Sequence, residues 1–146
     1  MSSFCVIGSG ISGATIANLL NKKHTVDLYD KARGLGGRSS FKRLDKIRGF
    51  DHGTQYFSTK TPEFNSFTKK LIEKKILKIW EGNHKFLSDK KKENKKHVKV
   101  IGRKGNNDIS KYLLKNVRCY FQSELKKINF QNRKWNLICL LYTSPS

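Results

Sequence analysis

The sequence has few of the residues that fix a fold through special chemistry. Its 146 residues include 3 cysteines, 2 prolines and 11 acidic residues, against 31 lysines and arginines. The cysteines form no Cys-x-x-Cys pair, which argues against a zinc site or a redox dithiol. We expect Cys5 and Cys119, both in strand-like segments, to be inert and to act as small buried hydrophobic residues.

Long hydrophobic runs are also missing. The longest apolar segments, such as residues 4–7 and 137–138, fall far short of the roughly 18 residues that suggest a membrane span. The first residues lack the basic region and apolar core of a secretory signal. We therefore expect a cytoplasmic protein with no membrane partner. A hydrophobic content of 36% indicates a folded chain, and the length is about that of one domain.

The formal net charge of +20 is the best argument for a different kind of function, because basic proteins favour phosphate backbones and anionic surfaces. The lysines are spread along the chain, however, and the dense run within residues 90–96 lacks the interleaved aromatic side chains that stack on bases. We interpret this run as a solvated loop and expect no specific nucleic-acid partner. A basic nucleic-acid-binding protein without enzymatic activity is the alternative hypothesis.

The order of expected elements begins with strand, glycine turn, helix and strand. Apolar periodicity predicts a strand at 4–7, a helix at 11–21 and a second strand at 25–29. Residues 31–57 lack a periodic pattern and are predicted to be irregular, and Thr61 is predicted to cap a helix that begins with Pro62. Beyond this helix we predict strands at 76–80, 84–87, 97–101 and 117–121, a short helix capped by Asn107 or Asp108, and a hairpin with strands 125–130 and 135–138.

The first motif, Gly8-Ser9-Gly10-Ile11-Ser12-Gly13, has the GxGxxG spacing of a dinucleotide-binding turn between a strand and a helix. Gly8 permits the tight turn, Gly10 lets the backbone approach a diphosphate, and Gly13 lets the helix pack close to the strand. Asp30 ends the second strand, where a carboxylate can accept hydrogen bonds from ribose hydroxyls. The glycine spacing alone is a weak signal, and a turn without a ligand is the alternative that this combination disfavours.

The second motif follows Asp30 directly and covers residues 30–38, D-K-A-R-G-L-G-G-R. Gly36 and Gly37 allow the backbone to pass close to a cofactor, and the guanidinium of Arg38 can bridge phosphate oxygens. This extension indicates FAD rather than NAD, since plain NAD-binding folds do not need it. The alternative is that Arg33 and Arg38 are merely solvated.

The third motif covers residues 50–57, F-D-H-G-T-Q-Y-F. Its glycine, amide side chain and aromatic residues suit a loop that frames a planar ring, although Tyr56 and Phe57 are equally consistent with ordinary core aromatics. His52 is a tempting acid–base residue, but we interpret it as structural. Flavin chemistry is carried by the cofactor, while the protein supplies placement and electrostatics.

Taken in this order, the three motifs resemble the FAD-dependent amine-oxidase-like superfamily, and residues 50–57 resemble its renalase-like branch. The resemblance runs from residue 3 to about residue 138. It implies an α/β fold, a Rossmann-like FAD-binding domain with a parallel βαβ sheet, additional strands and a β-hairpin. The same resemblance implies FAD contacts but no catalytic or metal-binding side chain. The implied cofactor-binding residues are Gly8, Gly10, Ile11, Ser12, Gly13, Asp30, Lys31, Arg33, Gly36, Gly37, Arg38, Gln55, Tyr56 and Leu125.

The resemblance also implies an activity, hydride transfer from a small organic donor to FAD, with dioxygen as the oxidant that restores the flavin. A renalase-like enzyme would take a reduced nicotinamide dinucleotide isomer, whereas other relatives take an amine or an unsaturated lipid precursor. The family closes the FAD site with a carboxyl-terminal Gly-Asp segment that is not found in this sequence. We therefore expect a cofactor-binding fragment, and a non-catalytic nucleotide-binding fragment is a third hypothesis.

For the domain organisation, we expect residues 1–138 to form the FAD/NAD(P)-binding domain, truncated relative to the family, with residues 58–101 as the first part of an inserted substrate domain. Residues 139–146 begin with C-L-L-Y-T-S, which TGTCTCTTATACACATCT, a transposon-end sequencing adapter, would encode. We interpret these residues as an artefact to be excluded from fold reasoning. The alternative is an ordinary polar terminus.

Overall fold

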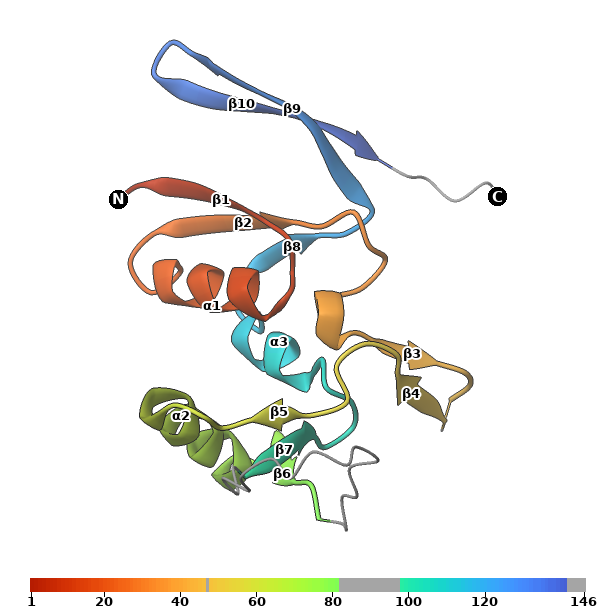
Figure 1. The fold of residues 1–146 in the computed structure, drawn as a ribbon. Coiled ribbons are helices and arrows are strands. Elements are labelled where there is room, and N and C mark those ends of the chain that lie inside the picture. The colour runs from red at the N-terminus through yellow and green to blue at the C-terminus, as the bar shows by residue number, and fades with distance from the viewer. Residues whose placement is uncertain (47, 82–97, 142–146) are drawn as a thin grey trace, which may run out of the picture.

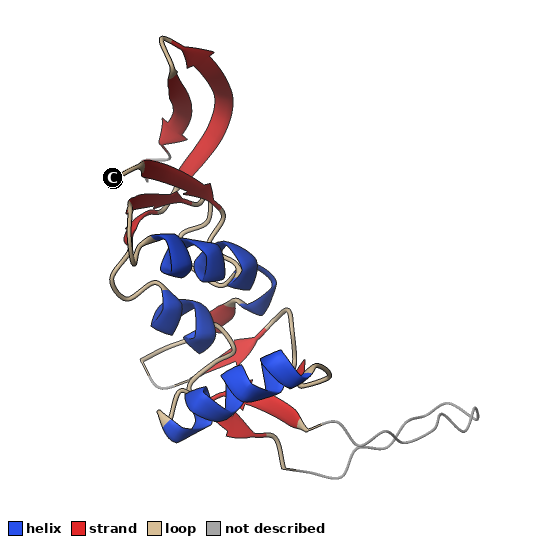
Figure 2. Ribbon diagram, turned by 90° about the vertical axis from the view of Figure 1, so that its left-hand side faces the viewer, coloured by secondary structure: helices blue, strands red, loops and turns tan. Residues whose placement is uncertain are grey.

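The computed structural model describes residues 1–46, 48–81 and 98–141. Its elements are stacked in layers, with a hairpin at one end, a parallel sheet and two helices in the middle, and a small antiparallel sheet with a third helix at the other end (Figures 1 and 2). In chain order the elements are β1 (Ser3–Ile7), α1 (Ile11–Leu20), β2 (Thr25–Tyr29), the 3-10 helix η1 (Gly37–Ser39), β3 (Phe41–Arg43), β4 (Gly49–Asp51), β5 (Phe57–Ser58), α2 (Pro62–Glu73), β6 (Leu77–Ile79), β7 (Lys99–Gly102), α3 (Asp108–Leu113), β8 (Arg118–Tyr120), β9 (Ser123–Gln131) and β10 (Lys134–Leu141).

The amino-terminal elements form a βαβ unit. β1 pairs with β2 in parallel, from Ser3 opposite Thr25 to Ile7 opposite Tyr29, and α1 is the crossover between them. β8 pairs with the other side of β2, also in parallel, and gives the strand order β1-β2-β8. The predicted strand, helix and second strand are confirmed, and so is the α/β, Rossmann-like fold class.

Small residues bring α1 close to the parallel sheet. Ala14 and Ala17 are fully buried, and a Cβ atom added at Gly13 would lie 1.9 Å from the carbonyl oxygen of Gly8. Two larger apolar residues of the helix, Ile16 and Leu19, face away from the sheet and are 46% and 53% exposed. At Gly13, Ala14 and Ala17 the helix lies so close to the strands that only glycine or alanine fits between them.

α3 lies between the two sheets and joins their interiors. The buried core is one continuous cluster that includes Leu28 of the parallel sheet, Ile109 of α3, and Leu77 and Val100 of the antiparallel sheet. The Asn18 side-chain amide of α1 donates to the carbonyl of Leu113 at 2.7 Å, which fixes the two helices relative to each other. Because the core is shared, α3 sets the position of the antiparallel layer against the βαβ unit.

The antiparallel layer consists of sheet β5-β7-β6 and helix α2. Thr61 caps α2 as predicted, with its hydroxyl oxygen accepting from the backbone N–H of Phe64 at 3.3 Å, and Pro62 is the first helical residue. β6 and β7 confirm the predicted strands near 76–80 and 97–101. The strand expected at 84–87 and the lysine-rich loop lie outside the described residues.

The expectation of an irregular segment over residues 31–57 is only partly right. The segment contains η1 and an antiparallel hairpin in which Phe41 of β3 pairs with Asp51 of β4. A Cβ atom on Gly49 would lie 2.4 Å from the Phe41 ring, so glycine lets the two strands meet. Strands of three residues are too short to show alternation in the sequence, and this is why the pattern gave no signal.

The predicted carboxyl-terminal hairpin is confirmed. β9 and β10 pair in antiparallel fashion around a two-residue turn at Asn132 and Arg133, whose φ angles are 52° and 59°. Such left-handed pairs match the twist of hairpin strands. The hairpin lies over the face of the parallel sheet opposite α1 without packing tightly on it, and β10 runs to Leu141.

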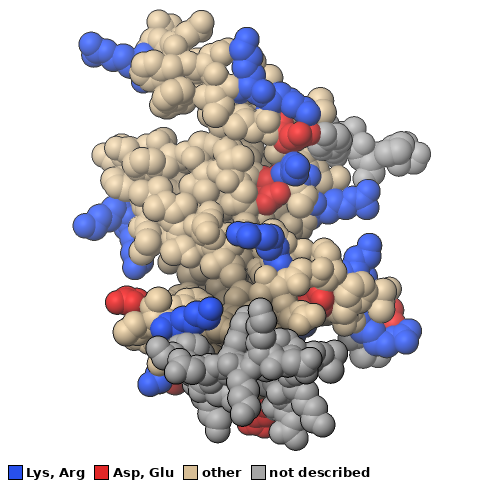
Figure 3. Space-filling model, viewed as in Figure 1, with Lys and Arg blue, Asp and Glu red and all other residues tan. Residues whose placement is uncertain are grey.

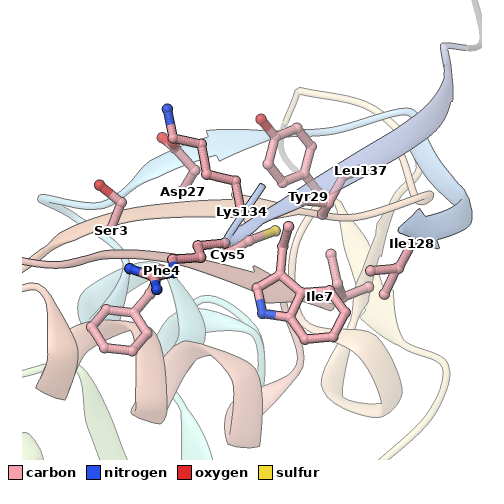
Figure 4. Close-up of a pocket in the computed structure, with 11 residues that line it drawn as sticks. Ser3, Phe4, Cys5, Ile7, Asp27, Tyr29, Ile128, Lys134 and Leu137 are labelled. Carbon is pink, nitrogen blue, oxygen red and sulfur yellow. The ribbon is translucent and has the colours of Figure 1, made fainter. Parts of the chain in front are cut away.

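The cysteines depart from expectation in one respect. Cys5 is exposed, and Cys119 is half-buried, and these two and Cys139 are free thiols. Loss of solvent around the thiol raises the pKa of Cys119 and, together with Cys139 and Asp27, that of Cys5. Both thiols are therefore protonated near neutral pH, which suits an inert role. The predicted burial of Cys5 is wrong, because its side chain points from β1 into the space below the hairpin (Figure 4).

Among the helices of the described residues, none combines the length and the apolar character that crossing a bilayer requires.

Replacing Gly13 tests the close contact between α1 and the first turn. We expect Gly13→Ala to lower the free energy of unfolding by about 3 kcal/mol, because its methyl group would overlap the Gly8 carbonyl and force helix and strand apart. Urea denaturation measures the change. Gly34→Ala is the matched control, since a Cβ atom there meets no heavy atom within 4 Å, and it should stay within about 0.5 kcal/mol of the parent. Equal stability of the two variants would contradict this account.

Candidate functional site

The two glycine-rich motifs meet in space. The backbone N–H of Gly36 donates to the carbonyl of Ser9 at 3.1 Å, and Gly10 and Gly36 form an isolated parallel bridge. A Cβ atom on Gly37 would lie 3.1 Å from the Cα of Gly10. The structure therefore brings both predicted glycine segments to one place, at the carboxyl end of β1.

The amino end of α1 is open at this place. Gly10 is the N-cap of the helix, and neither a side-chain cap nor an acidic residue occupies its first turn, which holds the predicted residues Ile11 and Ser12. A Cβ atom on Gly10 would meet only the Cα of Gly37, at 3.9 Å. Backbone N–H groups at the amino end of a helix, together with the helix dipole, attract anions such as phosphate. Here the lack of a side chain at Gly10 leaves the approach to them free.

Asp30 lies against the same turn. Its Oδ2 accepts hydrogen bonds from the backbone N–H of Ser9 at 2.7 Å and from the Ser9 hydroxyl at 2.5 Å. Its Oδ1 accepts from the backbone N–H of Ala32 at 2.8 Å. The carboxylate is thus held beside the glycine turn, with lone-pair capacity left on Oδ1. Ribose hydroxyls that approach Asp30 would compete with the Ser9 hydroxyl for Oδ2.

The loop after Asp30 presents the basic residues of the second motif. Lys31, Arg33 and Arg38 are exposed. Backbone bonds on either side of Asp30 tie the loop to the end of the parallel sheet, since Asp30 N–H donates to Tyr120 and Gln122 N–H donates to Ala32. These side chains are available to an anionic ligand, and their roles as cofactor contacts remain a prediction.

Leu125 lies in β9, the strand whose first residue is hydrogen-bonded to Asp30. The N–H of Ser123, the first residue of β9, donates to the carbonyl of Asp30 at 2.9 Å. Leu125 is two residues further along the same strand and is half-buried. This places it two residues along the strand from the backbone contact with Asp30, and its role as a cofactor contact remains a prediction.

The third motif crosses the second one. The N–H of Thr54 donates to the carbonyl of Arg38 at 2.7 Å, and a Cβ atom on Gly53 would lie 2.1 Å from that carbonyl oxygen. Nε2 of His52 is 3.1 Å from the Ser40 hydroxyl, a contact that ties the two loops together. The geometry around His52 suits the structural role that we assigned to it.

A buried asparagine that the sequence analysis did not single out organises the third motif. Asn106 is fully buried, and its side-chain amide donates to the carbonyls of Thr54 at 2.7 Å and Gln55 at 3.1 Å. Its Oδ1 accepts from Gly102 N–H, and its own N–H donates to Asp51 Oδ1 at 2.7 Å. Asn106 therefore fastens the third motif to the loop between β7 and α3. Only its place among polar residues before a short helix could have drawn attention to it.

Gln55 and Tyr56 have surroundings that differ from those of the glycine turns. The side chain of Gln55 is exposed. The ring of Tyr56 packs on Trp80 with centroids 5.0 Å apart, and the Lys99 ammonium lies 4.5 Å from the Tyr56 centroid. Tyr56 thus belongs to a cluster on the antiparallel layer, and its predicted place beside a flavin ring remains a prediction.

A cavity of about 890 Å³ lies between the parallel sheet and the hairpin (Figure 4). Its walls are mostly apolar, with Phe4, Ile7 and Tyr29 on the sheet side and Trp135 and Leu137 on the hairpin side. None of the predicted cofactor-binding residues lines it. It is separate from the glycine turns, and within the described residues no cluster of His, Cys, Asp and Glu side chains suits a metal ion.

Comparisons with known proteins agree with this geometry. Residues 6–71, which include both glycine motifs, the third motif and most of α2, match the family model described as an NAD(P)-binding Rossmann-like domain. The crystal structure of tetracycline destructase Tet(51) is similar to the chain with a TM-score of 0.51 and 19% sequence identity, over 95% of this chain. The match covers 35% of that protein, so the chain corresponds to about a third of its length.

Replacing Asn106 tests whether it fastens the third motif. We expect Asn106→Ala to lower the free energy of unfolding by about 3 kcal/mol, because it removes the partners of the buried Gly102 N–H and of the partly buried carbonyls of Thr54 and Gln55. Thermal or urea unfolding measures this. Asn116→Ala, at an exposed residue, is the control and should change stability by less than about 0.5 kcal/mol. A loss no greater than the control's would show that the motif is held by other contacts.

Proposed function

We propose that the chain binds FAD where the two glycine motifs meet, and that it forms the cofactor-binding part of an FAD-dependent oxidoreductase of the renalase-like or amine-oxidase-like kind. The observation that carries the proposal is the junction of Gly10 and Gly36 beside the carboxylate of Asp30. An open helix end, glycine backbone without side chains and a carboxylate in reach are what a dinucleotide requires.

The residues present fit such a cofactor. The N–H groups at the start of α1 would bind the diphosphate across the gap that a Cβ atom on Gly10 would fill. Asp30 would accept from the adenosine ribose, and Leu125 would contact the adenine. The second glycine pair and Arg38 extend the site beyond what NAD requires, and this favours FAD. When bound, the flavin would supply hydride transfer, and the protein's part would be to orient it and exclude water.

The substrate side of the proposal concerns the hydride donor. A small organic donor, a reduced nicotinamide dinucleotide isomer or an amine, follows from the motif resemblance. The chain corresponds to about a third of the structurally similar protein, so turnover would depend on residues beyond those described. We assign to this chain the holding of the cofactor, with no catalytic side chain of its own.

The positive charge is compatible with a dinucleotide ligand. On the face shown in Figure 3, Lys and Arg side chains are distributed over all layers, with acidic residues among them. A diffuse positive field raises the local concentration of anions and speeds their association. The nucleic-acid hypothesis needs a continuous basic track, and the described residues on this face do not form one.

Cofactor titration tests the proposal directly. We expect the purified chain to bind FAD and ADP, because the diphosphate and ribose contacts are common to both ligands. Isothermal calorimetry measures both, and the visible absorbance of bound flavin identifies FAD. If the chain binds neither FAD nor ADP, the proposal is overturned. Tight binding of duplex DNA that weakens steeply with salt, without any flavin binding, would favour the alternative.

Gly10 separates cofactor binding from folding. We expect Gly10→Ala to change the free energy of unfolding by less than about 1 kcal/mol, since its methyl group would meet only one atom, at 3.9 Å. The same methyl group would occupy the approach to the helix amides, so the affinity for FAD and ADP should fall at least about tenfold. Parallel unfolding and calorimetric titrations measure the two effects. Unchanged affinity for both ligands would rule out this location for the diphosphate.

A further inference from the structure

Asn107 carries a hydrogen-bonding side chain that the fold does not use. The residue is 8% exposed, and its Oδ1 is buried without a hydrogen-bond partner among the described residues. It is the N-cap residue of α3, yet its side chain makes no capping bond. The predicted cap at Asn107 or Asp108 is confirmed in position, since Asn107 is the N-cap residue, but its side chain forms no capping hydrogen bond. Asp108 instead accepts from the N–H of Lys104 at 2.8 Å.

A buried amide oxygen without a hydrogen-bond donor lowers the stability of the fold, so its presence at Asn107 needs an explanation. Leaving a buried acceptor without a donor costs about 1–3 kcal/mol. The neighbouring Asn106 shows that this loop can satisfy a buried amide fully, with bonds at both ends of its side chain. Asn107 would gain from a ligand that supplies the missing donor.

The surroundings of Asn107 show which part of a ligand would reach it. A Cβ atom on Gly36 would lie 2.9 Å from the Cβ of Asn107, so the residue borders the junction of the glycine motifs. Through Asn106, its loop is bound to Thr54 and Gln55 of the third motif. Asp30, which marks the ribose of the adenosine half, is held instead by Ser9 and Ala32. Asn107 therefore lies between the diphosphate position and the third motif.

We propose that Asn107 binds the hydroxylated chain that joins the diphosphate of FAD to its ring. This inference rests on the proposed function and adds a residue that none of the three motifs contains. The ribityl hydroxyls are O–H donors, which an amide oxygen accepts, whereas a diphosphate at neutral pH offers acceptors only. Gly36 has no side chain and a φ of 122°, a backbone conformation that favours glycine, and its lack of a Cβ keeps the path between Asn107 and the diphosphate position free.

Replacement by leucine, which has a similar shape and no hydrogen-bonding group, tests the proposal. We expect Asn107→Leu to weaken FAD binding about tenfold, the value of one buried hydrogen bond, and to leave ADP binding within about twofold, because ADP has no ribityl chain. The ligand-free variant should melt at the same temperature as the parent or higher, since an unpartnered polar group leaves the interior. Calorimetric titration and thermal unfolding measure these quantities. A residue with a purely structural role would not raise stability and weaken FAD together.

Ser110→Ala is the matched control. Ser110 lies one turn further along α3 and is fully buried, and its hydroxyl also has no partner within the part of the chain that the structure describes, but nothing places it beside Gly36. Its FAD affinity should stay within about twofold of the parent. Three outcomes would each overturn the assignment. The two variants could lose FAD affinity equally, Asn107→Leu could lose FAD and ADP affinity equally, or Asn107→Leu could keep its FAD affinity unchanged. If Asn107→Leu does not fold, Asn107→Ala takes its place, and failure of both to fold would make the side chain structural. If the parent chain binds ADP but the Asn107 assignment fails, the proposed function still stands.

Discussion

The whole site depends on one steric constraint, the contact between the backbone of Gly13 and the carbonyl of Gly8. Because Gly13 has no side chain, α1 can start directly after the turn and lie close to β1. That position directs the first N–H groups of the helix to the carboxyl end of the sheet, where the second glycine segment reaches them. A wider separation would move the helix end away from Asp30 and from Gly36 together. The geometry of the candidate site is therefore a consequence of packing in the first turn.

Local signals in the sequence were sufficient for the βαβ unit and for several of the later elements. Glycine spacing, the alternation of β2 and the Thr61–Pro62 pair each depend on neighbouring residues only, and the structure confirms the elements that they predicted. The meeting of the two glycine motifs was also inferable, because Asp30 and Gly36 follow the strand that lies beside the first turn. In these cases the interactions that form the element involve residues within or next to the sequence pattern that predicts it.

The features that the sequence did not reveal depend on contacts between distant segments. The exposure of Cys5, Ile16 and Leu19 follows from which face of a strand or helix is covered, and that is decided by elements far along the chain. The β3–β4 pairing depends on the fit of Gly49 against Phe41. The role of Asn106 arises from carbonyls about fifty residues earlier in the sequence. No pattern in a single segment contains such information.

The bond between the Ser9 hydroxyl and Asp30 has a consequence for the ligand-free protein. The serine hydroxyl donates to the carboxylate as a sugar hydroxyl would, in addition to the backbone N–H groups of Ser9 and Ala32. If the proposed nucleotide binds here, its ribose would replace a hydroxyl that already donates to Asp30, so both states would keep the carboxylate hydrogen-bonded. Under the proposed function, the internal hydroxyl would lower the affinity for the ligand somewhat and would keep Asp30 in place when the ligand leaves.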